Sequence, residues 1–224
     1  MYQAVLFDLD GTLIDSADDL GAALNFVLAK HNKPTVSAET YRTQASNGTL
    51  ALLKLGFGDE WQNLSNDEQT HLKEAFLTFY ANNLWCKSGF YQGIVPLITF
   101  LDEHAVPWSI VTNKPKHLTN PLVAQITQFA NCKNIVSGDT LERAKPYPDP
   151  LLYSCELMKV DPKCCIYIGD DERDIIAGNA AGMKTASALW GYLNGNPVSS
   201  WQSDFSFTNA CSLLNHISSC HDKK

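Results

Sequence analysis

The sequence lacks several features that would assign it to a common protein class. It has no apolar run near the roughly 18 residues of a membrane span, so we expect no membrane partner. Its formal net charge is −7, which excludes the basic surface of a nucleic-acid-binding protein. Internal repeats, low-complexity linkers and a leader-like N-terminal segment are also missing. We therefore expect a globular protein that is not secreted.

Cysteine spacing excludes two further classes. The chain has seven cysteines, an odd number, and no CxxC pair among them. This pattern argues against a disulfide framework and against a zinc site. We therefore expect reduced thiols and a cytoplasmic location. The 224 residues suffice for one full core and a smaller appended unit.

The first 89 residues contain one predicted strand and then only helical patterns. Residues 3–8, with an apolar run at 4–7, predict a strand buried on both faces. Two later segments carry apolar residues at helical spacing, and these are Leu20, Ala23, Leu24, Val27 and Leu28, and then Leu72, Ala75, Phe76, Phe79 and Tyr80. The pairs Ser16–Asp19 and Ser65–Glu68 predict capping boxes. The sequence therefore predicts an all-helical unit over residues 15–89.

From Gly93 onward, helical and strand patterns alternate. The predicted strands are 107–113, 133–139, 163–170 and 184–189, and the predicted helices are 95–104, 116–129, 148–158, 173–183 and 208–220. We expect Pro121 to be irregular or near a helix start. Such alternation predicts an α/β fold with an open parallel, Rossmann-like sheet and helices on both faces. The core is then 1–14 and 90–224, and residues 15–89 form an inserted helical cap domain over the sheet.

Polar residues follow three of the predicted strands. The first strand ends at Asp8, the second at Thr112 and Asn113, and a later one at Gly169 and Asp170. Because parallel strands end at one edge, where ligands bind, we expect convergence of Asp8, Asp10, Thr112, Asn113, Asp170 and Asp174. Several carboxylates at one place require a cation, and hard oxygen ligands suit Mg²⁺.

These residue types also fit the transfer of a phosphoryl group. An aspartate can attack phosphorus and form an aspartyl-phosphate. A second carboxylate two residues away can protonate the leaving oxygen and then activate water. Gly11 permits a tight turn beside the ligand. Thr112, Asn113 and Lys145 offer a hydroxyl, an amide and a positive charge to the phosphoryl oxygens.

Four segments together carry a resemblance to a known family. They are "DLDGTL" at Asp8–Leu13, "VTNK" at Val111–Lys114, "KPYPDP" at Lys145–Pro150 and "GDDERDIIAGNAAGM" at Gly169–Met183. In this order they resemble the motifs of the haloacid dehalogenase-like superfamily. The segments "VTNKP", "KPYPDPLL" and "ALWGY" are most similar to its phosphoglycolate phosphatase-like branch, which has a helical cap.

The resemblance implies a role for each motif residue. It implies that Asp8 is the nucleophile and Asp10 the general acid and base, while Thr112 and Lys145 hold the phosphoryl oxygens. The implied Mg²⁺ ligands are Asp8, the backbone carbonyl of Asp10 and Asp170, with Asp174 in the metal shell or orienting Lys145. The implied substrate contacts in these motifs are Gly11, Thr12 and Asn113.

One segment departs from the pattern of this branch. Its members usually carry a glycine-rich pair on the cap facing the substrate, whereas the corresponding stretch here, "ASNGTLALL", has one glycine. We therefore predict that Asn47 and Gly48 face the substrate. The substrate stays open between phosphoglycolate and another small phosphomonoester, such as a sugar phosphate.

The sequence thus predicts a Mg²⁺-dependent phosphatase for a small phosphorylated metabolite, acting as a monomer or homodimer. Alternatives within the superfamily are a phosphomutase and a phosphonate hydrolase, of which the latter requires a lysine on the cap. A non-enzyme alternative is a phospho-receiver switch, against which Asp10 and the helical insertion argue. Dehalogenation is disfavoured because dehalogenases of the superfamily lack a second acid at the position of Asp10.

Overall fold

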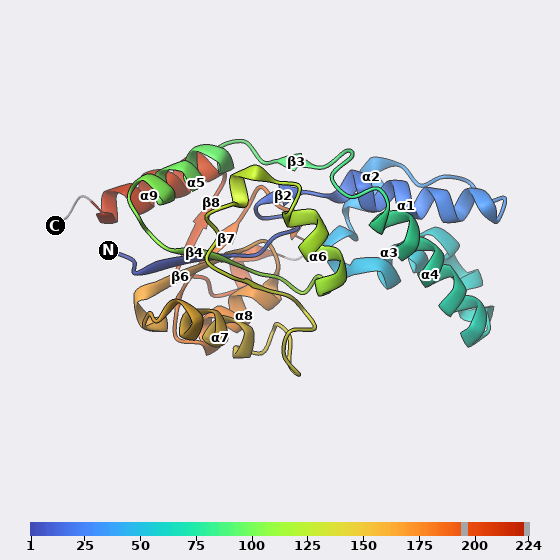
Figure 1. Cartoon of the computed structure of the whole chain (residues 1–224). Helices are drawn as coiled ribbons and strands as arrows, with labels where there is room; N and C mark the ends of the chain where they lie inside the picture. Colours follow the sequence, from blue (N-terminus) through green and yellow to red (C-terminus); the bar gives the residue numbers. More distant parts are fainter. Residues whose placement is uncertain (194–196, 222–224) are drawn as a thin grey trace. The chain divides into compact units, whose positions relative to one another are not determined.

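A computed structural model describes residues 1–193 and 197–221 of the chain (Figure 1). The chain divides into two compact units, one made of residues 1–14 and 90–224 and the other of residues 15–89. We call them the core unit and the helical unit. No helix in the described ranges has both the length and the apolar character needed to span a bilayer.

A six-stranded parallel sheet forms the centre of the core unit. Its strand order is β5-β4-β1-β6-β7-β8. The strands are β1 Ala4–Phe7, β4 Trp108–Val111, β5 Ile135–Val136, β6 Cys165–Gly169, β7 Lys184–Ala188 and β8 Phe205–Phe207. In β1, Val5 pairs with Trp108 on one side and with Ile166 on the other. This central place explains why every residue of β1 is apolar and buried, and it confirms the predicted parallel sheet.

Helices cover both faces of this sheet, as the alternating pattern predicted. They are α5 Ile94–Glu103, α6 Lys116–Val123, α7 Asp149–Met158, α8 Glu172–Ala180 and α9 Ala210–His221. In Figure 1, α5 and α9 lie on one face, while α7 and α8 lie on the opposite face. From β4 to β7, each strand is joined to the next along the chain by a segment that contains a helix.

The helical unit packs around its first helix. Its helices are α1 Ala17–Lys30, α2 Ala38–Arg42, α3 Gly48–Phe57 and α4 Asn66–Ala81. The predicted apolar face of α1 is buried. A Cβ at Gly21 would lie 2.4 Å from the Tyr41 ring, so glycine lets α2 approach α1 closely. Ser65 and Glu68 form the predicted capping box of α4.

The capping box predicted at the start of α1 is wrong. The side chain of Ser16 does not cap this helix. Asp19 is buried, and its carboxylate accepts hydrogen bonds from the backbone N–H groups of Cys86, Lys87 and Ser88 at 3.1, 2.8 and 3.0 Å. A long-range contact thus uses the carboxylate that the local pattern assigned to α1.

Four further details differ from the predictions. Pro121 lies inside α6, where it removes one helical hydrogen bond, and α6 ends at Val123 instead of continuing to Phe129. Strand β8 was not predicted. The short strands β2 Ile14–Asp15 and β3 Gly89–Phe90 pair with each other where the chain passes between the units.

Candidate active site

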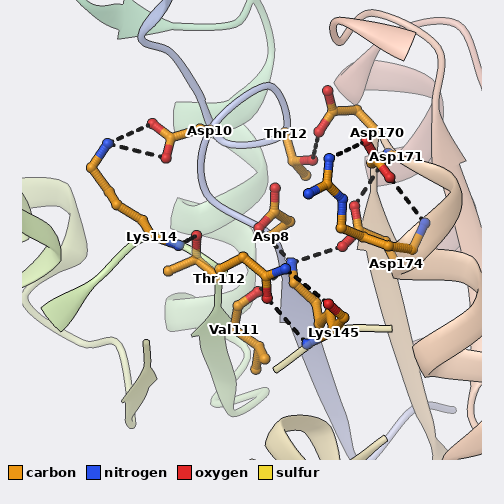
Figure 2. Close-up of polar contacts among 12 residues, drawn as sticks. Asp8, Asp10, Thr12, Val111, Thr112, Lys114, Lys145, Asp170, Asp171 and Asp174 are labelled. Carbon is orange, nitrogen blue, oxygen red and sulfur yellow. Dashed lines mark hydrogen bonds and ion pairs between the residues drawn. The ribbon is translucent and has the colours of Figure 1, made fainter. Parts of the chain in front are cut away.

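Polar side chains from three strand ends lie together in the core unit. Asp8 follows β1, Thr112 follows β4 and Asp170 follows β6. These strands are adjacent and parallel, so their carboxyl ends share one edge of the sheet. Figure 2 shows the three side chains at this edge, with Lys145 among them.

Lys145 is the centre of the buried hydrogen-bond network. Its Nζ lies 2.7 Å from Oδ1 of Asp8 and 2.7 Å from Oδ1 of Asp174. The same atom lies 2.8 Å from the hydroxyl of Tyr167 and 3.0 Å from the carbonyl oxygen of Val111. The ammonium has only three protons for these four oxygens. Lys145 therefore holds two carboxylates in fixed positions, one directly after β1 and the other in the first turn of α8.

Negative charge exceeds positive charge in this network. Burial raises the pKa of Asp8 to about 7, with further raising by Asp174 and Asp10 and opposite action by Lys145. Burial also raises the pKa of Asp170 well above its ordinary range. Burial lowers the pKa of Lys145, but the carboxylates of Asp174 and Asp8 outweigh this, so its pKa is raised. The acids of this site thus favour an additional cation.

The acidic residues fit a hard divalent cation. Asp8, Asp170 and Asp174 are buried, and each offers one carboxylate oxygen within 4.8 Å of the other two. Asp170 accepts hydrogen bonds from the Thr12 hydroxyl at 3.0 Å and from the Tyr192 backbone N–H at 2.9 Å. Both of these donors are neutral groups. Converging carboxylate oxygens are the ligands that Mg²⁺ prefers.

Asp174 uses its two oxygens differently. Oδ1 pairs with Lys145 at 2.7 Å. Oδ2 accepts a hydrogen bond from the Asp171 backbone N–H at 3.2 Å, and this bond belongs to the capping box at the start of α8. The helix terminus therefore fixes the carboxylate that orients Lys145, and the same carboxylate borders the acidic cluster.

Two glycines allow Asp170 to lie close to the backbone. Gly11 has a φ of +89°, and a Cβ there would lie 2.1 Å from Oδ2 of Asp170. A Cβ at Gly191 would lie 2.2 Å from Cβ of Asp170. Thr12, whose hydroxyl bonds Asp170, also accepts a hydrogen bond from Nε1 of Trp190 at 2.9 Å through its carbonyl oxygen. The structure thus places Gly11 and Thr12, both predicted substrate contacts, against Asp170.

Asp10 faces a lysine that the sequence analysis did not assign. Nζ of Lys114 lies 3.2 Å from both carboxylate oxygens of Asp10, and Figure 2 shows the Asp10 carboxylate turned toward Lys114. The backbone N–H of Lys114 donates to Oγ1 of Thr112 at 3.2 Å. The sequence signal that could have identified Lys114 is its position two residues after Thr112, a predicted site residue.

Asn113 and Tyr167 both support Lys145. Nδ2 of Asn113 donates to the carbonyl oxygen of Lys145 at 2.9 Å, and its Oδ1 accepts from the Lys145 N–H at 3.1 Å. Asn113 thus fixes the backbone at Lys145. Tyr167 belongs to the apolar run of β6, and its role was missed. A tyrosine in a buried strand requires a hydrogen-bond partner for its hydroxyl. This requirement was the sequence signal that Tyr167 takes part in a polar network.

The two residues predicted to face the substrate from the cap belong to the helical unit. Asn47 ends a short 3₁₀ helix, Ala45–Asn47, and its exposed side chain donates to Oε1 of Gln44 at 3.1 Å. Gly48 begins α3 with a φ of +75°.

Comparison with known proteins identifies the class to which this fold and site belong. A profile described as haloacid dehalogenase-like hydrolase matches residues 2–182. The chain therefore belongs to the haloacid dehalogenase-like hydrolase family, as the motifs predicted. This membership agrees with strand ends that bring an aspartate, a threonine, a lysine and further acids to one edge of a parallel sheet.

Particular relatives within this family are phosphatases by name. The chain is 38% identical over 203 residues to a phosphoglycolate phosphatase of Xanthomonas campestris pv. campestris, covering 90% of both chains. It is 35% identical over 192 residues to an N-acetylmuramic acid 6-phosphate phosphatase of Pseudomonas aeruginosa, covering 86% of this chain and 84% of the relative. A solved structure of a predicted phosphoglycolate phosphatase from Haemophilus somnus 129PT is also similar. It has a TM-score of 0.87 and 27% identity, covering 96% of this chain and 98% of that one.

Proposed function

We propose that the chain is a Mg²⁺-dependent phosphatase that hydrolyses a small phosphomonoester through an aspartyl-phosphate on Asp8. The observation that carries this proposal is the Asp8 carboxylate, held by Lys145 at 2.7 Å at a strand end beside two more buried acids. An aspartate fixed in this way is oriented for attack, and family membership supports the same chemistry.

The first half of the reaction breaks the ester bond. A carboxylate oxygen of Asp8 attacks phosphorus, and the bond between phosphorus and the ester oxygen breaks. Asp10 donates a proton to the departing oxygen, so the alcohol leaves neutral. Lys145 and Thr112 hold the phosphoryl oxygens and stabilise their charge. Lys145 is suited to this role because its ammonium is already fixed by Asp8 and Asp174.

The second half releases phosphate. Asp10, now a carboxylate, takes a proton from water, and the water oxygen attacks phosphorus. The bond between phosphorus and Asp8 breaks, which restores the Asp8 carboxylate and frees inorganic phosphate. One ester and one water thus give one alcohol and one phosphate.

The metal would be held by the acids at the same edge. Asp8, the backbone carbonyl of Asp10 and Asp170 are the proposed ligands, and Asp174 borders them. When bound, Mg²⁺ would supply the positive charge that the buried carboxylates and the phosphoryl group require.

We propose the helical unit as a cap over the substrate. The cap would exclude water during the first half-reaction and open for product release. The segments 14–16 and 88–93 are the proposed hinges, because the chain passes between the units there. Asn47 and Gly48 are the proposed substrate contacts of this cap.

The relatives suggest which substrates to test. By name they act on phosphoglycolate and on N-acetylmuramic acid 6-phosphate. Each of these compounds is a phosphate monoester that also carries a carboxylate. We propose a substrate of this kind for the chain, which would act in the cytoplasm, where its seven free cysteines stay reduced. Purified protein with Mg²⁺ should release phosphate from at least one of the two compounds. Release from neither of them, nor from a panel of sugar phosphates, would contradict the proposal.

A further inference from the structure

At the edge of the site, the ammonium of Lys114 forms an ion pair with the carboxylate of Asp10. Nζ of Lys114 is equally distant from both oxygens of Asp10, at 3.2 Å. The two side chains are 6% and 17% exposed, respectively. Both distances exceed the roughly 2.7–2.9 Å of a tight charge-assisted hydrogen bond. Lys114 therefore already binds the two oxygens of a carboxylate, in a geometry that another carboxylate can reproduce.

The backbone at Lys114 is held by contacts that do not involve Asp10. Its backbone N–H donates to Oγ1 of Thr112 at 3.2 Å. Its carbonyl oxygen accepts from the Thr119 hydroxyl at 3.0 Å and from the Gly138 N–H at 3.0 Å. Three contacts that do not involve Asp10 thus hold the backbone at Lys114.

The proposed reaction requires Asp10 to turn. Asp10 must reach the ester oxygen of the substrate to serve as acid and base, and its carboxylate then leaves Lys114. Removing one member of a largely buried ion pair is costly unless another charge replaces it. In the proposed reaction the turn follows substrate binding, so a negatively charged group of the substrate can replace the Asp10 carboxylate at Lys114.

We infer that Lys114 determines specificity by binding a carboxylate on the leaving-group half of the substrate. This substrate carboxylate takes the place of the Asp10 carboxylate when Asp10 turns toward the ester oxygen. The inference rests on the proposed phosphatase function and narrows its substrates to phosphate esters of hydroxy acids.

Two matched pairs of esters test the inference. The compound 2-hydroxyethyl phosphate differs from 2-phosphoglycolate by replacement of the carboxylate with an alcohol, and N-acetylglucosamine 6-phosphate lacks the lactyl carboxylate of N-acetylmuramic acid 6-phosphate. The kcat/KM of each ester is measured with Mg²⁺ for the wild type, for Lys114→Met and for Lys116→Met. Lys116 is exposed on the same segment and serves as the control.

The wild type should prefer the acidic member of at least one pair. Lys114→Met should reduce this preference by about 10- to 100-fold, the size of a lost hydrogen bond to a charged group, mainly through KM. Lys116→Met should keep the wild-type preference. If Lys114→Met slows both members of a pair equally, Lys114 only positions Asp10 and the inference is wrong.

Binding without turnover separates this inference from the proposed function. Asp8→Asn and the double variant Asp8→Asn/Lys114→Met are titrated calorimetrically with 2-phosphoglycolate and 2-hydroxyethyl phosphate. The inference is supported if Asp8→Asn binds 2-phosphoglycolate more tightly than 2-hydroxyethyl phosphate and the double variant binds the two equally. This result would support it even if the wild type releases no phosphate. If Lys114→Met does not fold, Lys114→Gln replaces it, and equal wild-type affinity for the two members of both pairs still overturns the inference.

Discussion

Two glycines with similar backbone conformations show how differently the two units are built. Gly11 in the core unit and Gly48 in the helical unit have φ values of +89° and +75°. A Cβ at Gly11 would lie 2.1 Å from the Asp170 carboxylate, whereas a Cβ at Gly48 would have no atom within 4 Å. The core unit therefore surrounds its polar groups tightly, while the helical unit leaves space at the residues proposed to contact substrate. The candidate catalytic site is closely packed at Gly11, whereas the proposed cap contact Gly48 has open space beside it.

Two buried carboxylates sharpen this comparison. Asp19 in the helical unit accepts hydrogen bonds from three consecutive backbone N–H groups and from the Ser88 hydroxyl. Asp8 in the core unit is instead held by the ammonium of Lys145 and has further acids beside it. The carboxylate of Asp19 is stabilised by hydrogen bonds from neutral groups. Asp8, in contrast, lies in a cluster of acids whose charge favours a cation. Burial of an acid alone therefore does not indicate catalysis.

The largest effect is expected from Asp8→Asn. The variant should lose turnover, because an amide cannot serve as the nucleophile, and it should remain folded because it removes one of several repelling buried charges. Phosphate release and thermal unfolding measure the two effects. Asp59→Asn, at an exposed position of the helical unit, is the control. A variant that keeps a tenth of the wild-type rate would remove Asp8 as the nucleophile.

Asp10→Asn should have the next largest effect. One group serves both leaving-group protonation and water activation, so we expect both half-reactions to slow, by about 10²–10⁴-fold. Rapid-quench detection of the phosphorylated enzyme separates the two steps. Normal rates of phosphorylation and dephosphorylation in this variant would contradict the assignment of Asp10.

Metal removal tests the charge argument for the core unit. The folded-state pKa of Asp8 is about 7 against an ordinary value of 3.8. The folded metal-free protein therefore binds this proton more tightly than the unfolded chain, and its stability should fall as pH rises from about 4 through about 7. Mg²⁺ competes with protons for the carboxylates. The stabilisation of the folded protein by Mg²⁺ should therefore grow with pH. A saturating concentration near 100 times Kd would contribute about 2.7 kcal/mol.

Thermal unfolding with EDTA or Mg²⁺, at about pH 5 and about pH 8, measures this linkage. The Mg²⁺-dependent shift in Tm should be larger at the higher pH. Activity should vanish in EDTA and return with Mg²⁺, and Ca²⁺ should inhibit because its larger shell favours bidentate binding of Asp8. Equal Tm shifts at both pH values, or full activity with Ca²⁺ alone, would count against a Mg²⁺ site at these acids.

The smallest effect is expected in the helical unit. Asn47→Ala should raise KM or shift the preference among phosphomonoesters, because it removes an exposed amide proposed to contact the non-phosphate half. The metal requirement should not change. Measured kcat and KM values across several substrates decide the point. Changes within about 0.5 kcal/mol for every substrate, the size of an ordinary surface substitution, would place specificity elsewhere.

The sheet could be predicted where burial left a clear pattern in the sequence. Strands β1, β4 and β6 are buried on both faces, which produces continuous apolar runs that stop at polar residues. Strand β8 has three residues, Phe205–Phe207, with an exposed serine between two half-buried rings. So short a segment at a sheet edge carries no pattern distinct from a loop.

The candidate site could be predicted for residues that lie in motifs but not for contacts made across the chain. Asp8, Lys145 and Asp170 follow strands or occupy recognisable segments. Lys114 meets Asp10 across 104 positions, and Tyr167 meets Lys145 across 22. Asp19 is another contact that the local sequence did not predict. The pattern assigned its carboxylate to a helix cap, but the carboxylate accepts hydrogen bonds from backbone amides 67 to 69 residues away.

The central place of β1 in the sheet determines when the site can assemble during synthesis. The proposed nucleophile follows β1, yet the two neighbours of that strand begin only at Trp108 and Cys165. At 5–20 residues per second, the chain needs on the order of ten seconds or more to reach the second neighbour. The uninterrupted segment 15–89 is complete well before that. The nascent chain therefore carries Asp8 without Lys145 or Asp170 until those later segments have been made, and the candidate site cannot assemble before Asp170 emerges.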